Sequence, residues 1–119
     1  VTFLFSMNKS DCVIVQLDYI TKVITHSNNA ERILGYSLSE HINNKALVCF
    51  DVIAPEDTKT VIKAVATAKA DNKCTFCSAG VKIKKKDKFS YRMFNFSFLP
   101  ITDNRGTTTM IQAIVLPQS

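Results

Sequence analysis

A run of alternating side chains near the C-terminal end limits the folds open to this chain. From residue 89 to 99 the sequence reads FSYRMFNFSFL, with phenylalanine at every second position from Phe94 to Phe98. Successive side chains of a β-strand point to opposite faces, so this period of two predicts one long strand. The face opposite the phenylalanines is expected to carry Tyr91, Met93, Asn95 and Ser97. The aromatic face must be buried, which predicts a sheet covered by a second layer.

Strand-like segments lie at both ends of the chain, and helical spacing occupies the middle. The expected strands are 12–17, 22–25 (or 22–26), 74–83, 89–99 and 107–116. Turns are expected at Asp18-Tyr19 and at 103–106, where turn-forming residues gather. Two groups of strands separated by helices predict an α+β fold, an antiparallel sheet with helices on one face. The pattern does not dictate the strand order.

Two clipped helices are expected before residue 45. The first follows an N-cap at Asn28 or Asn29 and stops before Gly35, because glycine tolerates the left-handed conformation that often ends a helix. The second begins at Ser37, which can form a capping box with Glu40.

A longer helix is expected to begin at Pro55, which suits the first turn of a helix. Glu56 and Asp57 are expected to stabilise its positive end, and the helix is expected to end near Asn72. Its apolar face is expected to consist of Thr58, Val61, Ile62, Val65 and Ala68.

The chain has 119 residues, of which 46% are apolar, enough for one core and one domain. No apolar run reaches the ~20 residues that a membrane helix needs, and the start lacks the basic region of a signal peptide. The sequence is typical of a domain from a longer protein. We expect an N-terminal apolar cap segment at 1–9, the domain at 10–116 and a tail at 117–119.

Five lysines within one short segment account for the whole net charge of +5. This basic patch consists of Lys82, Lys84, Lys85, Lys86 and Lys88. Such a run is typical of a solvated hairpin tip, and it also suits contact with an anionic partner. No aromatic residue is interleaved within the run, so direct contact with nucleic acid is not expected.

The four cysteines are Cys12, Cys49, Cys74 and Cys77. They show no disulfide framework, so free thiols and an intracellular location, cytoplasmic or nuclear, are expected. Cys74 and Cys77 have the spacing of half a zinc site, but the histidines, His26 and His41, are distant and unpaired in any motif. No metal site is therefore expected.

Several short motifs occur in an order that resembles a PAS domain. They are NNAE at 28–31, LGYS at 34–37, Glu40, PED at 55–57 and LPITD at 99–103. The resemblance covers about residues 10–116. It implies a five-stranded antiparallel sheet of strand order 2-1-5-4-3, with strand 12–17 central and a lid of short helices over one face.

The light-sensing LOV branch of that family binds flavin through a reactive cysteine. The corresponding position falls near Ala46, which has no thiol, and Cys49 comes three residues late without the neighbouring motif. The amide side chains that the branch presents to flavin correspond to Asn95 and Gln112, which we expect to face away from the phenylalanines. Haem would need a histidine ligand, and both histidines are expected at the surface. Neither cofactor is expected.

If the three phenylalanines face the lid, they fill much of the family's cavity, which favours a dry, packed core. The alternative is a small apolar pocket that takes a lipid-like molecule. Its expected lining is Ile33, Leu34, Val48, Phe50, Ile53, Ile62, Phe94, Phe96 and Phe98.

No catalytic motif is present, neither a nucleophile elbow nor a phosphate-binding glycine loop, so no enzymatic activity is expected. The resemblance implies a regulatory module, in a transcription factor or sensor kinase, that pairs with itself or with another PAS domain. The expected interaction face consists of Phe3, Phe5, Tyr91, Met93, Met110, Gln112, Ile114 and Leu116. A ligand sensor is the alternative function. No membrane partner is expected.

Overall fold

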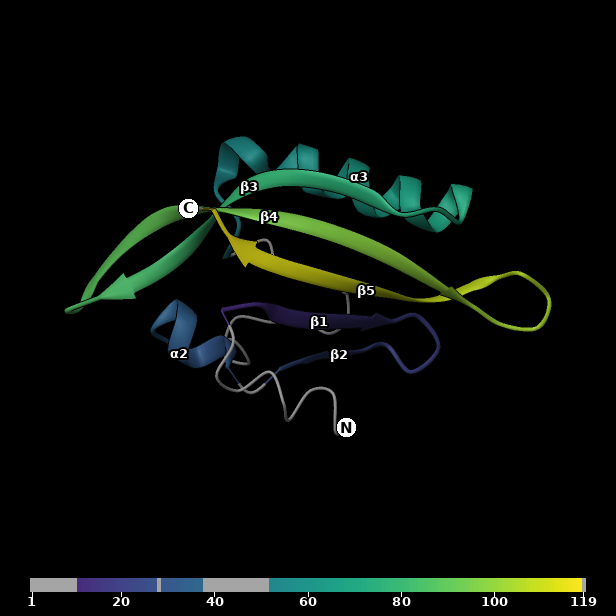
Figure 1. Cartoon of the computed structure of the whole chain (residues 1–119), viewed down its shortest axis with the longest axis horizontal. Helices are drawn as coiled ribbons and strands as arrows, with labels where there is room; N and C mark the ends of the chain where they lie inside the picture. Colours follow the sequence, from purple (N-terminus) through teal and green to yellow (C-terminus); the bar gives the residue numbers. More distant parts are fainter. Residues whose placement is uncertain (1–10, 28, 38–51, 119) are drawn as a thin grey trace.

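The computed structural model describes residues 11–27, 29–37 and 52–118. Five strands form one antiparallel sheet in the order β2-β1-β5-β4-β3 (Figure 1). They are β1 (Val13–Asp18), β2 (Val23–His26), β3 (Thr75–Lys85), β4 (Lys88–Thr102) and β5 (Thr108–Pro117). This confirms the α+β class and the strand order that the resemblance implied. β1 is an inner strand, while the middle position belongs to β5.

The alternation in β4 separates the two faces of the sheet as the sequence predicted. Phe94, Phe96 and Phe98 are buried, and the residues between them are exposed or half-buried. Phe94 lies opposite Ala79 of β3, and Phe98 lies opposite Ala113 of β5. We call the face that carries the phenylalanines the inner face and the opposite one the outer face.

Two helices and one 3-10 turn complete the described fold. They are α2 (Ala30–Leu34), the 3-10 turn at Pro55–Asp57 and α3 (Thr58–Asp71). Gly35 ends α2 with φ +86°, and Asn72 ends α3 with φ +51°. Both are left-handed, which confirms the predicted ends. The capping box of Ser37 and Glu40 falls partly outside the described residues. No described helix has the length and apolar character needed to cross a lipid bilayer.

Asn29 precedes α2 but forms no side-chain cap hydrogen bond, which corrects the first capping prediction. Its amide instead donates to the Cys12 carbonyl at 2.6 Å and accepts from the Ser27 hydroxyl. That hydroxyl also accepts from the Ile14 N–H at 3.0 Å. Asn29 therefore ties the start of α2 to β1, directly next to it at Cys12 and through Ser27, and these bonds take the place of the local cap.

Asp57 lies at the start of α3, as predicted, and its carboxylate also bonds to the sheet. Its carboxylate accepts from the Gly80 N–H of β3 at 2.8 Å and makes no cap bond to α3. The Ala54 N–H donates to the Gly80 carbonyl at 2.8 Å, and a Cβ at Gly80 would lie 3.0 Å from that of Ala54. The start of α3 is thus fastened to the edge strand at a position where glycine allows close approach.

The predicted apolar face of α3 is shifted in the structure. Ala64 and Ala68 are the buried residues of this helix, whereas Ile62 is 44% exposed. The Thr75 hydroxyl of β3 donates to the Ala64 carbonyl at 2.7 Å. The small alanine side chains let α3 approach β3 closely. The helix therefore packs through its alanine side, and its valines lie beside that contact over the sheet.

The C-terminal residues are fixed to the sheet. Pro117 belongs to β5, and the Gln118 N–H donates to the Met93 carbonyl at 3.0 Å. Two residues of the segment that we expected to be a tail, 117 and 118, are therefore bonded to the sheet.

Candidate functional site

A cavity of about 350 Å³ lies between the inner face and α3. Its described lining comes from the inner face, from α3, from the end of α2 and from the residues just before the 3-10 turn. The residues are Val13, Val15, Leu17, Tyr19, Leu34, Val52, Ile53, Val61, Ile62, Val65, Ala66, Lys69, Val81, Phe94, Phe96, Phe98, Ala113 and Val115. Nearly all are apolar, and the volume is at the small end of the range for small-molecule pockets.

The residues that the structure describes leave a cavity beside the three phenylalanines, which favours the alternative of a small apolar pocket over a core that they fill. Phe96 and Phe98 stack on one another along β4, with ring centroids 5.8 Å apart and planes at 22°. Because the helix rests on Ala64 and Ala68, its Val61 and Val65 side overhangs the rings and leaves space.

The predicted pocket residues fall into three groups. Those that line the cavity are Leu34, Ile53, Ile62, Phe94, Phe96 and Phe98. Ile33 does not line it and packs, half-buried, against the core elsewhere. Val48 and Phe50 lie outside the described residues.

One end of the cavity carries a positive charge that the sequence analysis missed. The Lys69 ammonium lies 4.0 Å from the ring centroid of Tyr19, and both residues line the cavity. Burial raises the pKa of the Tyr19 phenol, which keeps it neutral. Lys69 follows Val65 by four residues, so its place on the same face of the helix was open to prediction.

The outer face carries most of the predicted interaction residues. Tyr91, Met93 and Leu116 are exposed there, while Met110, Gln112 and Ile114 are half-buried. Phe3 and Phe5 lie outside the described residues. The structure adds two residues that were not predicted: Phe76 of β3, 72% exposed, and Phe89 of β4, 54% exposed.

A polar group interrupts this face. The Gln118 amide donates to Asn95 at 2.9 Å and to Ser78 at 3.1 Å, and the Ser78 hydroxyl donates to Asn95 at 2.8 Å. Asn95 lies opposite Leu116 in the sheet. The apolar stripe of Phe89, Tyr91 and Met93 therefore runs along β4 towards the hairpin and ends at these amides.

This arrangement of strands and helices is similar to that of several solved structures. No family model and no curated protein matches the sequence. Among solved structures, the chain is similar to a domain of a histidine kinase from Haloarcula marismortui described as light and redox sensing (15% identity, TM-score 0.69, 100% of both chains). It is also similar to the PAS domain of a protein from Colwellia psychrerythraea (16% identity, TM-score 0.67, 95% of this chain and 91% of that one). The chain has the PAS fold.

A third structure of this fold is the N-terminal domain of a diguanylate cyclase with a PAS/PAC sensor from Marinobacter aquaeolei. It is 13% identical with a TM-score of 0.65, and the match covers 89% of this chain and 94% of that one. At these identities the likeness concerns the arrangement of the chain.

The described lining of the PAS-fold cavity does not fit flavin. Asn95 and Gln112 lie between buried neighbours on β4 and β5, so their amides belong to the outer face. The lining that the structure describes contains no asparagine or glutamine. The hydrogen-bonding side chains that the LOV branch offers to the flavin ring are therefore turned away from the space that it would occupy.

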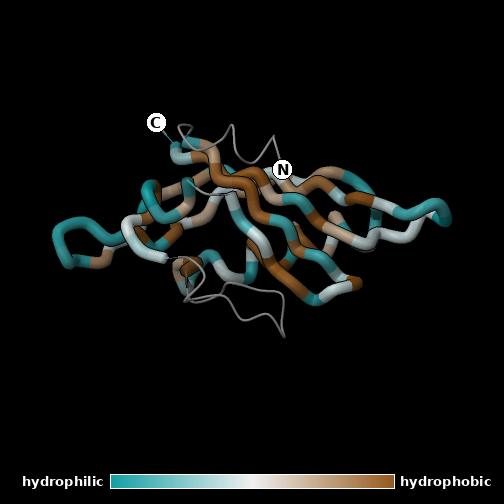
Figure 2. Tube along the Cα trace, turned by 90° about the horizontal axis from the view of Figure 1, so that it is seen from below, coloured by the Kyte–Doolittle hydropathy of each residue, from teal (hydrophilic) through white to brown (hydrophobic). Residues whose placement is uncertain are grey.

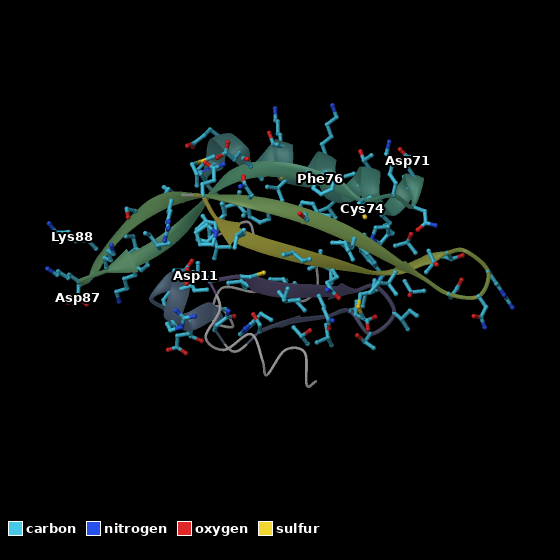
Figure 3. The ribbon with its side chains drawn as sticks, viewed as in Figure 1. Asp11, Asp71, Cys74, Phe76, Asp87 and Lys88 are labelled. Carbon is cyan, nitrogen blue, oxygen red and sulfur yellow. The ribbon has the colours of Figure 1, made fainter. Side chains whose placement is uncertain are left out.

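The basic patch lies at the tip of the β3–β4 hairpin, as predicted. Lys85 pairs with Lys88 across the turn of Lys86 and Asp87, both with positive φ (49° and 67°). Figure 2 shows hydrophilic loops at both extremes of the long axis, and Figure 3 places Asp87 and Lys88 at the far end of one of them. The tip therefore projects its charges away from the body of the domain.

An aromatic ring does lie among these lysines, although the linear sequence separates them. The ammonium groups of Lys82 and Lys84 lie 5.3 Å and 5.5 Å from the ring centroid of Phe89. Tyr36 meets the same ring edge-on, with the centroids 5.9 Å apart. The pairing of β3 with β4 brings this ring and the lysines together. The order of residues in the lysine-rich segment does not reveal this contact.

Reversing the charge of lysines 84–86 to glutamate is expected to weaken binding to heparin, used here as a polyanion probe. The variant should elute from a heparin column at clearly lower salt than the unchanged domain, because the charges sit close together. The control variant has the same change in net charge at another surface: Lys59 and Lys63 of α3 and Lys73, which follows α3, are replaced by glutamate. Equal shifts for the two variants would remove any special role for the tip.

Cys74 and Cys77, which have the spacing of half a zinc site, differ in their surroundings. Cys74 is exposed before β3, and Cys77 is half-buried within it. Burial, and then the nearby Asp57 carboxylate, raise the pKa of the Cys77 thiol. No group of three or more metal-binding side chains forms within the residues that the structure describes.

Proposed function

We propose that this PAS-fold domain is a signalling module that pairs, through its outer face, with a second copy of itself or with another PAS-fold domain. The carrying observation is the exposed apolar surface of the sheet: Phe89, Tyr91, Met93 and Leu116, with Phe76 on the edge strand. Exposed large apolar side chains that gather on one surface mark an interaction site more often than single ones do.

The structure of the sheet supports this proposal. An antiparallel sheet can leave one face open to solvent, in which case that face usually carries polar residues. Here β4 presents three large apolar side chains in succession at positions 89, 91 and 93. Desolvating them stabilises a complex by about 25 cal/mol for each Å² of apolar surface removed from water.

The wider role is that of a regulatory domain in a larger intracellular protein. The structures of similar fold are named as parts of a histidine kinase and a diguanylate cyclase. Those names support a role in signal transduction. The larger protein would be a sensor kinase or a transcription factor, and the proposal holds for either. The proposal assigns no catalytic step to this domain and no contact with a membrane.

Met93→Glu tests the pairing. Met93 is 42% exposed in the apolar stripe, so the charge should be tolerated in the monomer but buried in a complex, where it is costly. Sedimentation velocity should show a dimer for the unchanged domain and a folded monomer for the variant. Ile114→Glu is expected to act in the same direction.

The matched control is Ile20→Glu, because Ile20 is 72% exposed in the β1–β2 turn, away from the outer face. It should leave the dimer intact. A Met93→Glu variant that dimerises as before would contradict pairing through the outer face.

A second candidate function, ligand sensing, is favoured by the cavity beneath α3. A molecule bound there would contact Phe94, whose neighbour Met93 points to the outer face from the same strand. Ligand binding could thus bias the pairing surface through β4. Native mass spectrometry of the purified domain should then find added mass that denaturation removes, and a bare chain after exposure to candidate ligands would contradict it.

A further inference from the structure

We propose that the cavity selects a small amphiphilic anion, a medium-chain carboxylate whose tail lies among the apolar residues and whose head meets the Lys69 ammonium. The inference rests on the second candidate function, ligand binding in this cavity. It adds the chemical class of the ligand and the way in which the ligand is oriented.

The lining sets the character of the tail. The inner face contributes valines, an alanine, Leu17 and the three phenylalanines, and α3 contributes valines and Ile62. A space lined in this way takes up hydrocarbon without leaving polar groups unpaired. About 350 Å³ is small for a ligand site, which favours a single short chain over a sterol or a two-chain lipid.

The charge sets the character of the head. Among the described lining residues, Lys69 is the charged one. It forms no ion pair within the part of the chain that the structure describes, where the one ion pair joins Arg32 to Asp11. An ammonium at the end of an apolar cavity attracts one negative group and leaves the rest of the ligand to hydrophobic contact.

The position of Lys69 is held from two sides. The Thr108 hydroxyl of β5 donates to the Lys69 carbonyl at 3.2 Å, which fixes the helix backbone there. The Tyr19 ring holds the ammonium by a cation–π contact at 4.0 Å. These contacts keep the charge at the end of the cavity where β1 and α3 finish, so the carboxylate would lie at that end. The tail would then run towards Phe94 and Val81.

The experiment compares two ligands with the same tail. Calorimetric titration of the whole chain at low salt measures the affinity for decanoate and for decanol. Because Lys69 is exposed to solvent, we expect a modest preference for decanoate, about fivefold. Octanoate should bind more weakly than decanoate, by about fourfold for each methylene lost.

Two variants separate charge from shape. Lys69→Gln should bind decanoate and decanol equally, with the affinity for decanol unchanged. Lys59→Gln is the matched control, since Lys59 is an exposed lysine of the same helix outside the cavity lining. It should keep the preference for decanoate.

The outcomes distinguish the inference from the function beneath it. Equal binding of both ligands to the unchanged chain, or a preference that survives Lys69→Gln, would overturn the anion selectivity and leave a plain apolar site. Binding of neither ligand would overturn this inference together with ligand binding in the cavity.

Discussion

Gly35→Ala is expected to lower the free energy of unfolding by about 3 kcal/mol or more and the Tm by roughly 10 °C. Gly35 has φ +86°, which costs any L-residue conformational energy. A Cβ there would also lie only 2.1 Å from the backbone carbonyl oxygen of Lys84, so the end of α2 or the β3–β4 hairpin would have to move. Thermal unfolding followed by circular dichroism measures the loss.

Gly106→Ala provides a matched control with nearly the same backbone. Gly106 has φ +82°, but a Cβ there would meet nothing within 4 Å. Its substitution should cost only the conformational energy, about 1 kcal/mol. The difference between the two variants reports the contact of Gly35 with the hairpin. The Tyr36 hydroxyl, just after α2, donates to the Lys82 carbonyl of β3 at 2.7 Å, which requires the end of α2 to lie against β3. Equal losses of stability for the two variants would contradict this contact.

Asn29→Leu is expected to destabilise the domain by about 3 kcal/mol, because a buried hydrogen-bonding group is replaced by one that cannot bond. Asn29 is 2% exposed and accepts from the Ser27 hydroxyl while donating to the Cys12 carbonyl. The substitution removes both bonds in a part of the structure closed to water. Urea unfolding at equilibrium measures the change.

Asn104→Leu is the control for this substitution. Asn104 is exposed in the turn between β4 and β5, so its replacement should alter stability by only about 0.5 kcal/mol. If Asn29 acted merely as a helix cap, its loss would cost about 1 kcal/mol. A measured value that small would contradict the bridge between α2 and β1.

Local patterns predicted the fold well because they report on local physics. The alternation around Phe94 separated the two faces of β4, since a strand repeats every two residues. Gly35 marked the end of α2, and Pro55 marked the start of the 3-10 turn that leads into α3 at Thr58, because the backbone preferences of glycine and proline are strong. The strand order came from resemblance, because the patterns alone allowed several arrangements.

The features that the sequence did not reveal depend on contacts far along the chain. Asn29 looked like a local cap and Asp57 like a charge at a helix start, yet Asn29 bonds to Cys12 just before β1 and Asp57 bonds to Gly80 on β3. The cavity depends on the separation of α3 from the sheet, which Ala64 and Ala68 set by packing on β3. The sizes of the side chains along the sequence give little information on how far a helix lies from a sheet.

An isotope-filtered NMR experiment can show whether two chains pair through their outer faces. A dimer sample mixed from labelled and unlabelled chains reports only contacts between chains. We expect intermolecular signals from the methyl groups of Met93 and Leu116 on the outer face. Signals confined to another surface, such as the β1–β2 turn around Ile20, or no intermolecular signal at all, would contradict it.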